Sequence, residues 1–259
     1  MMGEIIDRKR KEMELHDHLR GDLVDDQRFQ ANKKFYSICQ SNRDFVKRWV
    51  LQRCKKKRVL DYCCGNGDFT IWLAENEVDA YGIDISPLSV ENAKKSANQK
   101  GLGDKVKFQV MDAEATDFPS RYFDFAVING VLHHLDLKKA YRELSRILRT
   151  DGEAICTEAL KHNMIIHLYR KMTPHLRSAW ETEHILGKED IEVAAHYFDN
   201  VEVLEFFHLL TIGAVPFRDL FIFEAIRRRL KALDSVILRL PLLKWQAWMV
   251  VFVLSNPRN

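Results

Sequence analysis

The chain has 259 residues, of which 46% are hydrophobic, and this is long enough for one large α/β domain with additions. A formal net charge of +3 is too small to indicate a dedicated nucleic-acid-binding protein. The five cysteines lack a zinc-binding spacing, no signal peptide opens the sequence, and no apolar run reaches the ~18 residues that span a membrane. We therefore expect a cytoplasmic protein without a metal site, at most peripheral at a membrane.

Residues 1–56 are highly charged and include an amphipathic stretch from Phe29 to Trp49. This pattern predicts an N-terminal helical segment ahead of the first strand.

A glycine turn follows the first predicted strand, at residues 58–62. The strand carries Asp61 near its end, and Gly65 and Gly67 precede a predicted helix. Glycines at such a junction let a ligand approach the backbone, and the helix start offers unpaired N–H groups. Asp84 ends a second short strand 17 residues after Gly67, where a ribose diol binds in a doubly wound sheet. The sequence thus predicts a site for a cofactor that contains a nucleoside.

The residues around the turn favour S-adenosylmethionine over a dinucleotide. A dinucleotide fingerprint requires a third glycine at position 70, where this chain has Thr70. Asp61 would repel a pyrophosphate, whereas it would attract the ammonium group of S-adenosylmethionine.

The remaining core alternates between strand and helix patterns, which predicts a parallel sheet with helices on both faces. We expect strands near 58–62, 79–84, 105–110, 124–129, 152–158, 201–207 and 248–254, and helices near 68–76, 87–99, 137–149 and 188–198. Ser86 and Pro87 suit the cap and first turn of the second of these helices.

Five segments between residues 57 and 160 resemble, in the same order, the motifs of class I S-adenosylmethionine-dependent methyltransferases of the small-molecule type. They are residues 61–67, 81–85, 110–114, 123–135 and 144–152. The resemblance implies a Rossmann-like, doubly wound seven-stranded α/β sheet of order 3-2-1-4-5-7-6 with the last strand antiparallel. Cys63 departs from the pattern, because the family usually has its first glycine there, and cysteine adopts a positive φ less readily.

The resemblance also implies a cofactor-binding set. Its members are Tyr36, Asp61, Cys63, Gly65, Gly67, Asp84, Ile85, Asp112, Ala113 and Asn129. Asp61 would attract the methionine ammonium, and the Asn129 carbonyl would accept from it as well. Asp84 would accept both ribose hydroxyls, since an ionised carboxylate offers two acceptor oxygens.

The other members of the set would hold the adenine or close over the cofactor. Ile85 would pack on the adenine face, Asp112 would accept from its amino group, and the Ala113 N–H would donate to its ring. Phe35 and Tyr36 would either cap the cofactor, as helices before the first strand do in this family, or pack as core residues of their helix.

His133 and His134 are the leading catalytic candidates. A sulfonium methyl group is already activated, so catalysis mainly requires an acceptor held at about 3 Å in line. A base is needed where the acceptor must lose a proton, and histidine accepts one near neutral pH. Adjacent residues point different ways, so we expect one of the two histidines to be structural. His162, His184 and Glu158 are second candidates.

Two segments, 161–187 and 213–246, lie outside the motifs and are expected to form the acceptor pocket or its lid. Residues 211–259 carry eight Lys or Arg and three Asp or Glu. A basic, apolar helical segment suits a lid, a homodimer interface or contact with a membrane surface. All three stay open.

The sequence therefore predicts an S-adenosylmethionine-dependent methyltransferase that releases S-adenosyl-L-homocysteine and acts on a small, apolar, aromatic or lipid-like acceptor. One alternative is an RNA or protein methyltransferase that uses the basic C-terminal region. The other is a non-catalytic homologue that keeps the fold, since fold does not determine function.

Overall fold

The computed structural model describes residues 8–14, 17, 35, 37–173, 180 and 183–258. Its strands are β1 Arg58–Tyr62, β2 Asp79–Asp84, β3 Val106–Val110, β4 Phe123–Asn129, β5 Leu148–Ala159, β6 Phe198–Phe207 and β7 Met249–Pro257. Its α-helices include α3 Gln40–Arg53, α4 Asp68–Glu75, α5 Pro87–Gln99, α6 Leu137–Ile147, α7 Met164–Met172, α9 Lys188–Glu192 and α10 Phe223–Ile237. Residues 8–14 are also helical.

The seven strands form one sheet of order β3-β2-β1-β4-β5-β7-β6, which confirms the predicted order. β1 to β5 run parallel, whereas β7 is antiparallel to both of its neighbours. Because β1, β2, β4 and β5 are parallel, their carboxyl ends meet at one edge of the sheet, which is where α/β folds bind ligands.

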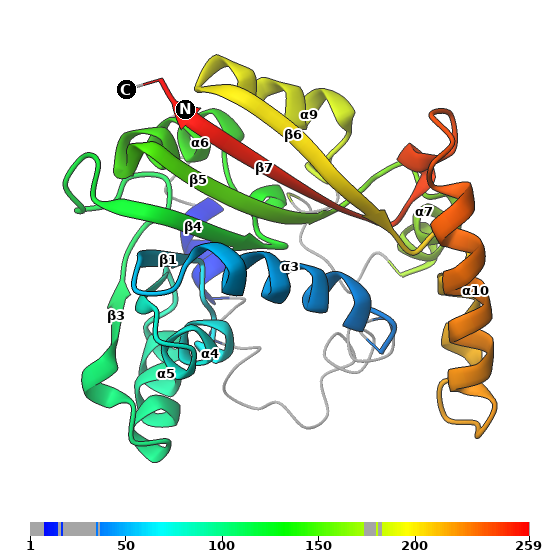
Figure 1. Cartoon of the computed structure of the whole chain (residues 1–259), viewed down its shortest axis with the longest axis horizontal. Helices are drawn as coiled ribbons and strands as arrows, with labels where there is room; N and C mark the ends of the chain where they lie inside the picture. Colours follow the sequence, from blue (N-terminus) through cyan, green and yellow to red (C-terminus); the bar gives the residue numbers. More distant parts are fainter. Residues whose placement is uncertain are drawn as a thin grey trace.

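Helices cover both faces of the sheet (Figure 1). One core unites a sheet face with α6 and α9 and is built around Tyr62, Phe123 and Tyr141. The other unites the opposite face with α3, α4 and α5. In the latter, the Trp49 ring of α3 meets Phe125 of β4 edge to face at 5.8 Å, so α3 belongs to the covering layer of the sheet.

The start of α5 follows its predicted capping chemistry. The Ser86 Oγ accepts from the Ser89 N–H at 3.0 Å, and Pro87 occupies the first turn. By contrast, the predicted helix over 188–198 is wrong in its second half. α9 ends at Glu192, a 3-10 turn covers Val193–His196, and β6 begins at Phe198 because this fully buried residue pairs with Pro257 of β7.

A third, smaller core lies at the carboxyl end of the sheet. It joins Ile166 of α7, Ile212, Val215 and Trp248 to the inner side of α10. α7 and α10 therefore sit together beyond the ends of β5, β6 and β7 (Figure 1). Within the described part of the chain, no helix combines the length and apolarity needed to cross a membrane.

Candidate active site

The glycine loop between β1 and α4 adopts a left-handed backbone at three positions. The φ angles are +61° at Cys63, +54° at Gly65 and +77° at Gly67. A Cβ on Gly67 would lie 2.7 Å from both the Ala93 Cβ and the Phe108 ring, so glycine is required there on two grounds. Cys63 takes the positive φ that the family's glycine would take, despite its side chain.

Asp84 ties this loop to the end of β2. Its Oδ2 accepts from the Gly65 N–H and its Oδ1 from the Ser86 N–H, both at 2.9 Å. The side chain is buried, and each oxygen keeps acceptor capacity beyond its backbone bond. Asp84 is therefore held where a ligand with paired hydroxyl groups could meet it, and Ile85 follows it directly.

Asp61 faces the helix behind the loop. The Thr70 hydroxyl donates to its Oδ2 at 2.7 Å. Burial raises the Asp61 pKa to about 7, against the Thr70 hydrogen bond, which lowers it. Thr70, which stands where a dinucleotide fingerprint has its third glycine, thus donates a hydrogen bond to Asp61.

Asp112 and Ala113 follow β3, and the N-terminal helical residues lie against them. The Asp112 Oδ1 accepts from the Glu114 N–H at 2.9 Å, and its Oδ2 lies 2.5 Å from the Lys9 Nζ. Burial lowers the Lys9 pKa, but its bonds to Asp112 and Glu114 outweigh this and raise it overall. Lys9 is therefore an ammonium group on the carboxylate predicted to hold the adenine.

The N-terminal contacts were not predicted. Arg8 forms an ion pair with Glu114, Glu12 lies 3.1 Å from the Nδ1 of His134, and Asp17 accepts from the Ser86 hydroxyl. The one signal in the sequence is the basic run at residues 8–11, which by itself indicates no partner.

His133 is anchored by Glu158 of β5. The Glu158 Oε2 lies 2.9 Å from the His133 Nδ1, and its Oε1 accepts from the N–H groups of Val131 and Leu132 at 2.8 and 2.7 Å. Glu158 has no exposed surface. A buried carboxylate with three donors acts as an acceptor, which places the proton of neutral His133 on Nδ1 and leaves Nε2 as its basic nitrogen.

The structure brings these elements to one edge of the sheet. Asn129 ends β4 beside Thr157 of β5, and the His133 and His134 rings lie 4.2 Å apart just beyond it. His133 is held by the core, whereas His134 contacts the N-terminal helical residues. The position of His133 thus depends on β5, and that of His134 depends on the N-terminal helical residues.

The remaining candidates differ in what they contact. The Arg8 guanidinium, which pairs with Glu114, lies 4.6 Å from the centre of the Trp180 ring. His184 stacks on Trp180 with ring centres 3.6 Å apart, and its Nδ1 lies 2.9 Å from the Trp180 carbonyl oxygen. Phe35 packs against Tyr169 of α7 at 4.6 Å, so it belongs to the third core. Tyr36 lies outside the described residues, and its capping role stays a prediction. Among the described side chains, no three His, Cys, Asp or Glu are grouped as metal ligands.

Two buried oxygens near this edge suit a ligand that donates hydrogen bonds. Asn66 Oδ1 in the glycine loop and Thr157 Oγ1 on β5 have no hydrogen-bond partner among the described residues. Unpaired buried polar atoms are costly, so each calls for a partner. S-adenosylmethionine carries donors in its ammonium, amino and hydroxyl groups, which suit these two oxygens. Arg8 Nε and Nη1, beside Glu114, are also buried without a hydrogen-bond partner among the described residues.

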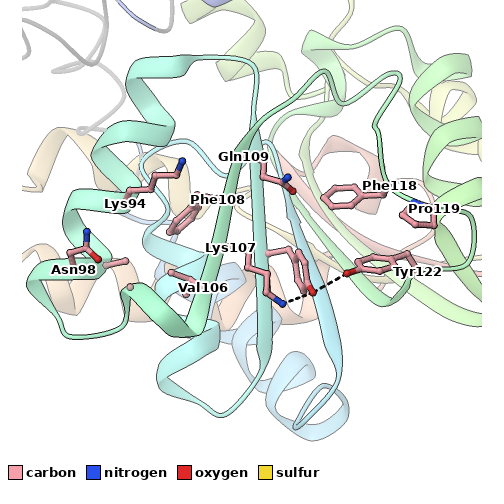
Figure 2. Close-up of a pocket in the computed structure, with 12 residues that line it drawn as sticks. Lys94, Asn98, Val106, Lys107, Phe108, Gln109, Phe118, Pro119 and Tyr122 are labelled. Carbon is pink, nitrogen blue, oxygen red and sulfur yellow. Dashed lines mark hydrogen bonds between the residues drawn. The ribbon is translucent and has the colours of Figure 1, made fainter.

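A separate groove of about 730 Å³ runs along the edge strand β3 (Figure 2). Lys107 Nζ donates to the Tyr81 hydroxyl at 2.6 Å, and the Tyr81 and Tyr122 hydroxyls lie 3.1 Å apart. The groove is bounded by the end of α5 and by residues that precede β3 and β4, so it lies toward the amino ends of the strands. It is therefore distinct from the site built on the carboxyl ends.

Comparisons with known proteins agree with this geometry. Residues 59–152 match the model of a family described as "Methyltransferase domain". Demethylmenaquinone methyltransferase of Geobacillus kaustophilus is 33% identical over 119 residues, which are 44% of this chain and 50% of that protein. The chain thus spans about half the length of this relative.

Solved structures share the fold at low identity. Geranyl diphosphate C-methyltransferase of Streptomyces coelicolor has a TM-score of 0.58 and 13% identity, over 91% of this chain and 88% of that one. The [4+2]-cyclase SpnF has a TM-score of 0.56 and 20% identity, over 85% and 84% of the two chains.

Proposed function

We propose that this protein binds S-adenosylmethionine and transfers its methyl group to a small apolar acceptor, because residues 59–152 match the model described as "Methyltransferase domain". The observation that carries the proposal is the convergence of the glycine loop, Asp84 and the Glu158-held His133 on one edge of the sheet.

The chain's own groups would divide the cofactor between them. Asp84 would accept the ribose hydroxyls, and the left-handed backbone at Gly65 and Gly67 would allow close approach. Asn129 would accept a hydrogen bond from the ammonium on its backbone carbonyl. Asp61, whose side chain is buried, would attract the same ammonium electrostatically. The Asp112 Oδ2 would accept a hydrogen bond from the adenine amino group. Because the Lys9 Nζ donates to the same oxygen, Lys9 would either share this oxygen with the adenine or move away from it.

When bound, the cofactor would supply an activated methyl group, and the chain would position the acceptor and manage its proton. His133 would take that proton on Nε2, because Glu158 holds Nδ1 and stabilises the charged imidazolium. Glu158 also fixes the loop after β4 through two backbone bonds, so it would act as a positioning residue.

Two observations support an apolar acceptor. Met164, Ile165 and Leu168 of α7 are exposed beyond the end of β5, which carries Glu158. In addition, the relative described as a demethylmenaquinone methyltransferase is named for a quinone. The neighbour described as a geranyl diphosphate C-methyltransferase is named for an isoprenoid chain that carries a diphosphate. We propose an acceptor of that class.

A second candidate follows from the neighbour described as a cyclase, since this fold accommodates reactions other than methyl transfer. The same site would then hold an apolar substrate without methylating it. An RNA or protein acceptor is less favoured, because the basic C-terminal region also exposes large apolar side chains.

The test is calorimetric titration of the protein with S-adenosylmethionine and S-adenosylhomocysteine, beside Asp84→Ala and the control Asp79→Ala. Asp79 starts the same strand and faces Arg58 and Lys107 at 3.5 Å. We expect micromolar binding that Asp84→Ala weakens at least about 100-fold and Asp79→Ala leaves intact, since Asp84 contributes two charged acceptors. Absence of binding by folded wild-type protein would contradict the proposal. Binding without methyl transfer to any quinone, isoprenoid or phenol would favour the second candidate.

A further inference from the structure

Exposed apolar side chains are concentrated at one end of the molecule. Fourteen large apolar side chains are exposed among the described residues, and all but Leu51 and Val110 lie in residues 164–172 and 217–243. Phe221 and Leu242 are 99% and 90% exposed. An apolar patch of this kind on a polar rim marks an interaction surface.

The exposed apolar residues of α7 form a stripe. Met164, Ile165, Leu168 and Met172 fall within about 100° on a helical projection, and Ile166 points to the opposite side, where it is buried in the third core. On α10, Leu233 and Val236 are exposed, while Ile226 and Leu230 pack against the same core. α7 thus turns one apolar side inward and another outward. On α10 the exposed Leu233 continues the apolar side of Ile226 and Leu230 beyond the core.

The charges beside these stripes are cationic. The acids Asp219 and Glu224 are paired with Arg218 and Arg227 at 2.8 and 2.6 Å, and Asp234 is buried on backbone N–H groups. Further exposed cations are Lys171, Arg228, Arg229, Lys231 and Arg239. We call these five cations, together with the twelve exposed apolar residues of 164–172 and 217–243, the basic apolar face.

The face lies at the catalytic edge of the sheet. α7 follows β5 directly, and α10 lies between β6 and β7 beyond their ends at the same edge (Figure 1). Glu158, which holds His133, is near the end of β5. A partner on this face would therefore lie beside the site proposed for the acceptor.

We propose that the basic apolar face docks on an anionic lipid bilayer, from which an apolar acceptor enters the site. Exposed apolar side chains at turns and along amphipathic helices insert at the level of the headgroups, and flanking Lys and Arg attract anionic lipids. A second copy of this chain suits the face less well, because the five exposed cations of one copy would repel the same five of the other. The supply of acceptor rests on the proposed function, whereas binding to the bilayer does not.

The test is sedimentation of the full chain with vesicles of phosphatidylcholine alone or with 30% phosphatidylglycerol, without cofactor. Phosphatidylglycerol gives the vesicle surface the negative potential that attracts Lys and Arg. We expect binding to the anionic vesicles that falls with salt. Replacement of Arg228, Arg229 and Lys231 by Gln should weaken it roughly 100-fold, since each cation near the surface contributes about fivefold. Phe221→Ser with Leu242→Ser should weaken it at least about tenfold.

The matched controls are Arg48→Gln, Lys57→Gln and Lys138→Gln together, and Leu51→Ser, all exposed on other elements. They should bind like the wild type. Equal binding to neutral vesicles, or no effect of the face variants, would overturn the proposal. A dimer by light scattering that the face variants dissociate would replace the bilayer with a second copy. Because no cofactor is present, failure here leaves the titration with S-adenosylmethionine unaffected.

Discussion

The half of the site on β1, β2 and β3 differs from the half on β4, β5, α7 and α10 in how it is assembled. In the first, the glycine loop, Asp84 and Ser86 are joined by backbone N–H groups, and the turn itself supplies the geometry. In the second, Glu158 reaches a histidine 25 residues away along the chain, and α7 and α10 meet through the third core. The first half of the proposed site thus depends on backbone N–H groups of turns and neighbouring strands, whereas the second depends on a side-chain pair and on packing between helices.

The largest effect is expected in the second half, at His133. His133→Ala should lower kcat by 10²- to 10⁴-fold with little change in cofactor affinity, because a general base contributes about that much. The measurement is methyl transfer from radiolabelled S-adenosylmethionine to an acceptor identified by screening. An equal loss of cofactor affinity would instead assign His133 to the first half.

Glu158→Gln tests whether Glu158 positions His133 for catalysis or only stabilises the fold. With a neutral partner the imidazolium is less stabilised, so the acid limb of the kcat/KM profile should shift to lower pH. The control is Glu143→Gln, a buried carboxylate that similarly accepts from a backbone N–H, that of Thr116, at 2.8 Å. If both variants merely lose stability and neither moves the profile, Glu158 is structural.

Gly67→Ala should destabilise the first half by about 2–3 kcal/mol and abolish cofactor binding, since the new Cβ meets both a positive φ and a steric clash. The measurement is the free energy of unfolding in urea. Gly101→Ala has a similar φ of +67° but open space around it, so it should cost only about 1 kcal/mol. Equal losses would show that the clash relaxes.

Two buried groups, Asp61 in the first half and His208 outside both halves, should give opposite pH dependences of stability. Burial raises the Asp61 pKa to about 7, so the unfolded chain ionises first and the free energy of unfolding falls as pH rises from about 4 to 7. Burial lowers the pKa of His208, beyond β6, to about 3, so the free energy of unfolding falls as pH drops below about 6.5. Asp61→Asn and His208→Asn should therefore change the slope of unfolding free energy against pH in opposite directions. Slopes equal to the wild type would contradict both assignments.

A smaller effect is expected where the N-terminal residues meet the first half. Lys9→Gln should strengthen cofactor binding a few-fold, because it frees the Asp112 Oδ2 for the adenine amino group. Arg10→Gln is the control, since Arg10 is exposed and lies 3.8 Å from Glu14. Weaker binding by Lys9→Gln alone would mean that Lys9 supports the cofactor rather than competing with it.

The smallest effect should come from Cys63→Gly. Relief of the positive φ gains roughly 1 kcal/mol, and loss of the packed thiol offsets part of it, so the free energy of unfolding should change by less than about 1 kcal/mol. Cofactor affinity measured by titration should be retained. A large loss would show that the Cys63 side chain has a role of its own.

The sequence by itself determined the glycine loop and the positions of Asp84 and Ser86, because glycine turns, helix caps and alternating strands and helices depend on residues close in the chain. The strand order was implied by the resemblance to a methyltransferase family, since it pairs strands far apart in the chain, such as β1 and β4. The sequence extended the predicted helix from residue 188 to residue 198, six residues past its end at Glu192. Phe198 belongs to β6 because it is buried in its pairing with β7, which no local pattern indicates. The Glu158–His133 pair, the Lys9–Asp112 contact and the Thr70 partner of Asp61 were decided only by the tertiary structure. The first two join segments far apart in the chain, which local sequence patterns do not bring together. Burial raises the pKa of Asp61, and this too is a property of the folded chain.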